Sequence, residues 1–257
     1  MESELKFNEK DIVCPGEILA EGMSFIPGQG MYRKGNYIYA SKLGLLKIEG
    51  KVLKIIPLSG KYLPKTGDVI IGKIKDVSIN GWSVDTNSAY SAMLSMKDGT
   101  SDFVRRGSDL TKYFDIGDYI LTKIINVTSQ NLIDLTMKGP GLRKLEQGRI
   151  LKVAPSKVPR IIGKQGSMVS MLKKATNTNI IVGQNGIVWI RGLNPNDEIL
   201  TVETIQKIER ESHLSGLTDR IKEFLESKGK KVDLSELNND EDNEKYENKE
   251  NYERNNY

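Results

Sequence analysis

The 257-residue sequence predicts a multidomain protein that is mainly β in its first half and α/β in its second half. Short apolar runs broken by glycine and proline fill residues 1–138, which is typical of small antiparallel β domains. After about residue 139, helical spacing of apolar residues appears beside strand spacing. The last twenty residues, 238–257, contain seven asparagines and no Val, Ile, Leu or Met, so we expect an acidic, asparagine-rich disordered tail there.

Residues 1–66 are predicted to form a small N-terminal antiparallel β domain. Their β-type runs include NYIYAS and KVLKIIPL, and the segments VCPGE, IPGQG and LSGKYLPKTG separate such runs.

Residues 67–138 are predicted to form a five-stranded OB-type barrel. Five strand candidates follow one another: DVIIGKIKDV, GWSVDTN, AYSAMLS, GDYILTKIINV and LIDLTMK. A turn at residues 79–82 joins the first two strands. An irregular insertion, TSDFVRRGSDLTKYF, precedes the fourth strand, and short strands with such an insertion are what an OB-type barrel requires.

Residues 139–213 change period and predict the order β-α-α-β-β-α. RILKVAP is a strand, SKVPRII and SMVSMLKKAT are helices, and NIIVGQ with IVWIRG forms a hairpin about residues 184–186. PNDEILTVETIQKIERESH is a long third helix. Residues 214–237 add an amphipathic helix, LTDRIKEFLESK, which ends at Gly229 and is expected to pack on this domain or on a partner.

Composition excludes several classes of function. The single cysteine, Cys14, and the single histidine, His213, can supply neither a disulfide nor a Cys/His zinc site. We expect a small buried hydrophobe at Cys14, a helix-end residue at His213, no catalytic residue, no metal and no cofactor. The sequence lacks a signal peptide pattern and any run of about 20 apolar residues, so a soluble, cytoplasmic protein is expected.

The charge distribution predicts an anionic partner. The chain carries a formal net charge of +4, and the tail holds three basic and seven acidic residues, so the remaining body carries +8. Between Gly148 and Gly192 there are eight basic residues and no Asp or Glu. The eight are Arg149, Lys152, Lys157, Arg160, Lys164, Lys173, Lys174 and Arg191. One face of this domain is therefore expected to meet phosphate groups.

The segment RIIGKQGSM, residues 160–168, contains two glycines separated by two polar residues, with a helical pattern on each side. A P-loop needs GxxxxGK[ST], so this spacing excludes one. A GxxG loop lets a sugar-phosphate backbone approach the main chain at the start of the next helix. The alternative is a helix-turn-helix in which the two glycines only permit a tight turn. The candidate RNA-binding residues are Gly163, Lys164, Gln165, Gly166, Arg160, Lys157 and Lys173, with Arg105 and Arg106 from the barrel's insertion. For the two insertion arginines, a solvated loop tip is an equally good interpretation.

Aromatic residues give a weaker signal. Trp82, Tyr90 and Phe103 are the barrel's candidates for stacking on bases, but Trp82 alternates with Val84 and fits the core equally well. Trp189 lies among apolar strand residues, where packing is favoured over base stacking.

Residues 139–213 resemble a type I KH domain, whose GxxG loop clamps nucleic acid. Residues 67–138 resemble an S1-motif domain. The domain order, a β domain followed by S1 and KH domains, resembles the archaeal exosome cap subunit family called ribosomal RNA-processing protein four. The resemblance runs from about Ile12 to His213, and CPGEIL, GQGMYRKG, YIYASKLG, PLSGKYLPKTGDVIIGKI, VPRIIGKQGSM and VGQNGIVWI carry it.

This resemblance implies a non-catalytic subunit. Three cap proteins would sit on a hexameric ring of RNase-PH-like subunits, bind single-stranded RNA and feed its 3′ end into the ring. The N-terminal domain would dock on the ring, Arg105 and Arg106 would lie near its entrance, and a poly(A) preference is a further implication. The cap would be a homotrimer or be mixed with a zinc-ribbon cap protein.

The sequence is also compatible with two other functions. A free-standing RNA-binding protein would differ only in lacking the ring. A nuclease would need a carboxylate-held metal, and the aspartates of the folded body are spread singly along strands and loops.

Overall fold

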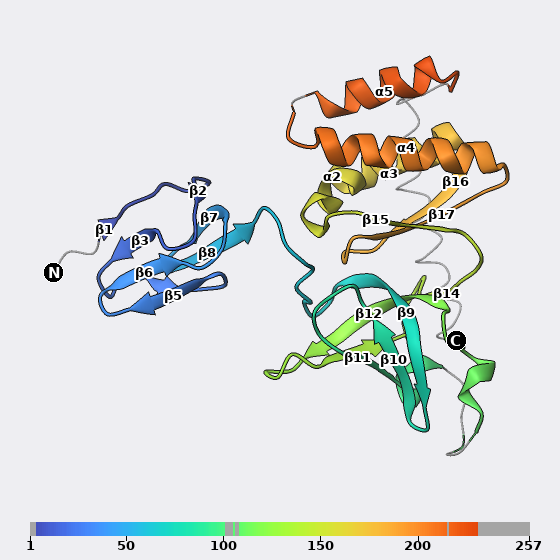
Figure 1. The fold of residues 1–257 in the computed structure, drawn as a ribbon, viewed down its shortest axis with the longest axis horizontal. Coiled ribbons are helices and arrows are strands. Elements are labelled where there is room, and N and C mark those ends of the chain that lie inside the picture. The colour runs from blue at the N-terminus through green and yellow to red at the C-terminus, as the bar shows by residue number, and fades with distance from the viewer. Residues whose placement is uncertain (1–3, 101–104, 106–107, 215, 231–257) are drawn as a thin grey trace, which may run out of the picture. The chain divides into compact units, whose positions relative to one another are not determined.

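The computed structural model describes residues 4–100, 105, 108–214 and 216–230. The chain separates into two compact units, Met1–Lys61 and Tyr62–Tyr257 (Figure 1). The tail expected at 238–257 lies outside the described residues, as do Phe103 and Arg106.

The first unit is built from two four-stranded sheets. One sheet has the order β1-β3-β6-β5, with β1 at Glu4–Leu5, β3 at Ile18–Glu21, β6 at Tyr37–Ala40 and β5 at Met31–Lys34. The other has the order β2-β7-β8-β4, with β2 at Ile12–Val13, β7 at Gly44–Glu49, β8 at Val52–Pro57 and β4 at Ile26–Pro27. All pairs are antiparallel except β4 with β8. The N-terminal β domain expected from the sequence is confirmed.

The second unit begins with the predicted barrel. Its five strands are β9 (Val69–Ser78), β10 (Gly81–Asp85), β11 (Ala92–Ser95), β12 (Tyr119–Val127) and β13 (Ile133–Thr136). The order β13-β11-β10-β9-β12 closes because β12 also pairs with β13. A sixth strand, β14 (Arg143–Leu145), extends the sheet at β12. Two short helices, α1 (Met96–Gly99) and η1 (Leu110–Lys112), belong to the connection between β11 and β12.

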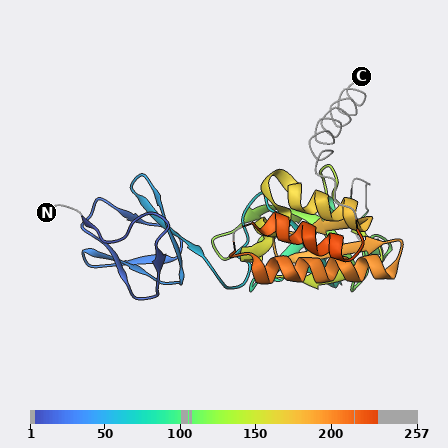
Figure 2. The same cartoon turned by 90° about the horizontal axis from the view of Figure 1, so that it is seen from above.

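The rest of the second unit follows the predicted β-α-α-β-β-α order. β15 (Arg149–Lys152), β17 (Ile187–Gly192) and β16 (Thr178–Val182) form an antiparallel sheet. The helical segments are η2 (Pro155–Lys157), α2 (Val158–Ile162), η3 (Lys164–Gly166), α3 (Ser167–Thr176) and α4 (Pro195–Glu211). An added helix, α5 (Leu217–Ser227), lies against α4, and the two views show the helices layered on one side of the sheet (Figure 1 and Figure 2).

Helix α5 is part of the domain core. Leu217, Ile221 and Leu225 recur at helical spacing and join the apolar cluster that Met168 and Ile205 also enter. The sequence predicted that this helix packs either on its own domain or on a partner, and the structure shows that it packs on its own domain.

Cys14 is exposed, so the expectation of a buried cysteine is wrong. Val13, the second residue of β2, takes the core position with no exposed surface, and strand alternation turns the next residue outward. The Cys14 N–H donates a hydrogen bond to the Glu17 carboxylate over 2.7 Å. In the described part of the chain, no helix is long and apolar enough to cross a membrane.

Candidate nucleic-acid interface

The GxxG loop owes its shape to glycine at its first position. Gly163 ends α2 with φ 79° and ψ 177°, and a Cβ placed there would lie 2.6 Å from the Met168 backbone nitrogen. Gly166 also has a positive φ, 81°, but a Cβ there would meet nothing within 4 Å. Gln165 is left-handed as well, at φ 53°. Gly163 is therefore required by packing, whereas Gly166 leaves open space beside the main chain.

The loop leads directly into the N-terminus of α3. Gly166 is the N-cap of α3, and within the described ranges no side chain caps this helix end. The first-turn N–H groups of a helix attract anions because they lack intrahelical partners and carry partial positive charge. The N-terminus of α3 therefore lies where the glycines allow a close approach, and the Ser167 N–H there already donates to the Lys164 carbonyl.

Arg149 and Arg191, both from the acid-free stretch, are each paired with a glutamate in the fold. Arg149 Nε lies 2.7 Å from Glu198 Oε2, and Arg191 pairs with Glu146. Both acids lie outside the stretch, so the sequence count overstated its free charge. Among the described residues, no ion pair is formed by the side chains of Lys152, Lys157, Arg160, Lys164 or Lys173.

The Arg149 pair is held in place by a further hydrogen bond. The Gly192 N–H donates to Glu198 Oε1 over 3.0 Å. This backbone bond, followed by the Arg149 guanidinium, lowers the pKa of Glu198 below its ordinary value. Arg149 is therefore engaged in holding β15 to α4, and it is a poorer phosphate ligand than the unpaired cations.

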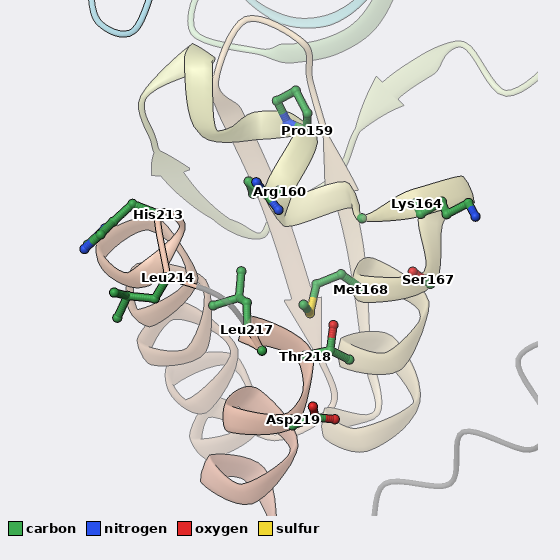
Figure 3. A pocket seen from close by; sticks show the side chains of 12 residues that line it. Pro159, Arg160, Lys164, Ser167, Met168, His213, Leu214, Leu217, Thr218 and Asp219 are labelled. Carbon is green, nitrogen blue, oxygen red and sulfur yellow. The ribbon is translucent and has the colours of Figure 1, made fainter. Parts of the chain in front are cut away.

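A pocket of about 600 Å³ adjoins the GxxG loop (Figure 3). Of the predicted site residues, Arg160, Gly163 and Lys164 line it. Lys157 is half-buried, and Gln165, Lys173 and Arg105 are exposed. Of the barrel's predicted arginine pair, Arg105 is described and Arg106 is not.

The two tryptophans pack inside the protein. Trp82 has no exposed surface, its ring lies edge-on to Phe114 with centroids 5.1 Å apart, and its Nε1 donates to the Phe114 carbonyl over 3.0 Å. Trp189 is 3% exposed and donates to the Glu146 carbonyl over 3.0 Å. Tyr90 packs half-buried against the barrel core. Neither tryptophan can stack on a base without leaving its core position.

Sequence reasoning missed the role of Asn185. It was expected only as part of a hairpin turn, but it is fully buried against the barrel. Its Nδ2 donates to the carbonyls of Ile71, over 2.7 Å, and Thr86, over 2.9 Å, and its Oδ1 accepts from the Ile71 N–H over 3.3 Å. A burial of this kind leaves no trace in an Asn-Gly turn, because the same dipeptide suits an exposed hairpin.

An apolar cluster surrounds this contact between the barrel and the β15-β17-β16 sheet. Ile71 and Leu145 from the barrel's sheet pack with Ile187 and Trp189. The Gln184 N–H also donates to the Val69 carbonyl over 3.0 Å. Hydrogen bonds and apolar burial together fix the barrel against the GxxG-containing domain.

No group of three or more His, Cys, Asp or Glu side chains in the described ranges is placed to hold a metal ion. The geometry thus offers cations, glycines and a helix N-terminus. These groups are the kind that bind phosphate.

A barrel of the OB type joined to a β-α-α-β-β-α domain with a GxxG loop defines an RNA-binding protein. Family models match all three parts: an exosome RNA-binding protein RRP4 N-terminal domain at residues 10–59, an RRP4 S1 domain at 61–108 and a KH domain at 148–196. The chain belongs to the Rrp4 family of exosome RNA-binding proteins, which are not the catalytic subunits.

Curated relatives agree with this family. An exosome complex component Rrp4 of Thermococcus kodakarensis is 47% identical over 222 residues, covering 85% of this chain and 86% of the relative. That of Pyrococcus furiosus is 48% identical over 224 residues, covering 85% and 84%. A crystal structure assigned as an exosome complex RNA-binding protein superposes with a TM-score of 0.61 at 37% identity, covering 65% of this chain and 97% of that one.

Proposed function

We propose that this chain is a non-catalytic cap subunit that captures single-stranded RNA for an RNase-PH-like hexameric ring, which degrades or trims the RNA from its 3′ end. The observation that carries the proposal is the GxxG loop of a member of the Rrp4 family. The loop places cations that form no ion pair with other described residues beside the N-terminus of α3, where the N-cap is a glycine. The cap is proposed to be a homotrimer or to be mixed with a zinc-ribbon cap protein, in the cytoplasm.

RNA capture is assigned to the unpaired cations near the loop. Arg160 and Lys164 lie on either side of Gly163 and form no ion pair within the described residues, whereas Arg149 and Arg191 are each held by a glutamate. We propose that four further cations extend this positively charged surface along the bound RNA strand: Lys157, Lys173, Arg105 and Arg106.

The test compares two double variants in titrations with a labelled single-stranded RNA. Arg160→Ala with Lys164→Ala should weaken binding at least tenfold. It should also flatten the slope of log K against log salt by up to about 1.4, since each neutralised phosphate of a single strand contributes about 0.7. Arg149→Ala with Arg191→Ala removes the same charge and serves as the control. Equal losses in the two variants would remove the GxxG surface from the mechanism.

Docking on the ring is assigned to the first unit, because it exposes a row of apolar side chains. Ile12, Leu45 and Ile56 are cross-strand neighbours on β2, β7 and β8. Ile12 is 61% exposed and Ile56 is 49% exposed. Leu43 and Leu58, next to these strands, are also exposed. Contiguous exposed apolar surface of this kind is characteristic of protein interfaces.

The docking proposal is tested by affinity purification followed by native mass spectrometry. The parent chain should bring down two RNase-PH-like proteins in a three-fold assembly, and Ile12→Lys with Ile56→Lys should release them. Ile79→Lys, at a residue 76% exposed in the barrel, is the matched control. A parent chain that binds RNA but recovers no ring would instead support the second candidate, a free-standing RNA-binding protein.

A preference for poly(A) belongs to the same proposal. Competition by unlabelled RNA homopolymers against a labelled strand measures this preference directly. Equal competition by poly(A), poly(C), poly(G) and poly(U) would contradict it.

A further inference from the structure

The pocket beside the GxxG loop has two walls that come from different parts of the sequence (Figure 3). One wall is α2, the loop and the first turn of α3. The other is formed by His213 and Leu214, which follow α4, and by the start of α5, so the pocket depends on the helix that is added to the six-element domain. Its volume of about 600 Å³ lies within the range of roughly 300–1,000 Å³ that is usual for ligand sites.

The pocket combines an apolar floor with a polar rim. Met168 and Leu217 face each other between the two walls, and they are only 5% and 8% exposed. Arg160 lies on the α2 wall. His213, which follows α4, and Lys164 lie on opposite sides of the pocket, and their side chains extend outward from it (Figure 3). A guanidinium group is flat and can stack on a nucleic-acid base. An apolar floor with Arg160 at its edge suits a base better than a phosphate alone.

The rim also carries a carboxylate without a partner. Asp219, in the first turn of α5, is exposed and forms no ion pair or hydrogen bond with other described residues. A carboxylate only accepts hydrogen bonds, so the ligand atoms beside Asp219 must be donors. The phosphate of the same nucleotide has to lie away from Asp219, at Arg160 and Lys164.

The donor requirement separates the four bases. Adenine, cytosine and guanine each present an exocyclic amino group. Uracil presents a single ring N–H between two carbonyl oxygens, and a carboxylate repels these oxygens. A base held with its pairing edge toward Asp219 is therefore recognised by its amino group.

We propose that this pocket receives one amino-bearing base of single-stranded RNA, with the phosphate toward Arg160 and Lys164 and the amino edge toward Asp219, and that it disfavours uracil. The inference rests on the proposed RNA-binding function and adds a subsite to it. It also gives α5 a role in recognition in addition to its role in the core.

The test measures affinities of the full chain for oligo(A) and oligo(U) of equal length. Asp219→Asn should lower the ratio of oligo(A) to oligo(U) affinity by at least about tenfold, the size expected for one hydrogen bond to a charged acceptor. Glu223→Gln, which removes an exposed carboxylate of α5 that does not line the pocket, is the control. If Asp219 only repels phosphates, removing its charge would raise the affinities for oligo(A) and oligo(U) equally and leave their ratio unchanged.

A second variant addresses the cavity itself. Thr218 lines the pocket and is exposed, so Thr218→Phe should fill the space without disturbing the core. Weaker oligo(A) binding at an unchanged urea midpoint supports the subsite. If the parent chain binds RNA and the ratio responds to neither variant, the pocket proposal is overturned while the proposed function stands. If the parent chain binds neither RNA, both are overturned.

Discussion

Asn185 provides the sharpest test of how the barrel and the GxxG-containing domain are joined. Replacing it with Ala removes both donors from the carbonyls of Ile71 and Thr86 and leaves the buried Ile71 N–H without its acceptor. Each intramolecular hydrogen bond contributes about 0.5–1.5 kcal/mol net, and an unsatisfied buried group costs about 1–3 kcal/mol. We therefore expect Asn185→Ala to lower the free energy of unfolding by about 2–4 kcal/mol.

Urea denaturation followed by tryptophan fluorescence measures this loss, because Trp82 and Trp189 report on the barrel and on the sheet packed against it. With a slope of about 2 kcal/mol per molar urea, the expected loss moves the midpoint down by about 1–2 M. Gln184→Ala, at the exposed neighbouring residue, is the control. An Asn185→Ala midpoint equal to that of the control would refute the hydrogen-bond argument.

Three further predictions concern the loop, the partly buried carboxylate of Glu198 and the RNA complex. Gly163→Ala should cost about 2–4 kcal/mol of stability, because its Cβ would meet backbone at a positive φ, whereas Gly166→Ala should cost only about 1 kcal/mol; equal urea midpoints would contradict this. Glu198→Gln should destabilise the protein by about 1 kcal/mol at pH 7. Because the folded pKa of Glu198 is lowered, this difference should persist above its unfolded pKa of about 4.3 and vanish as the pH falls through the folded value; thermal melts at pH 7 and pH 3 measure it. RNA affinity should fall steadily with added salt, and a salt-independent affinity would contradict phosphate recognition.

The prediction for the glycine loop also changes how the loop can be studied. A variant that places Asp at both Gly163 and Gly166 would mix two effects, since the first position is required for packing and the second faces open space. Substitution at Gly166 alone, or at the cations beside the loop, separates RNA binding from folding.

The sequence alone determined the order of elements and most of the surface chemistry. Strand runs with glycine and proline breaks predicted the β domain and the barrel, because alternation and turn residues are local properties. The GxxG spacing, the helical periods on either side of it and the excess of basic residues predicted an RNA-binding surface for the same reason. The apolar stripe of α5 was visible, although not the surface that it covers.

Only the tertiary structure decided which groups meet. Arg149 and Arg191 are paired by glutamates far away in the sequence, Trp82 and Trp189 are buried, Cys14 is exposed, and Asn185 joins two domains. The pocket arises because α5 returns to the GxxG loop. Each of these outcomes depends on residues brought together from distant parts of the chain, and composition, period and spacing describe only neighbours.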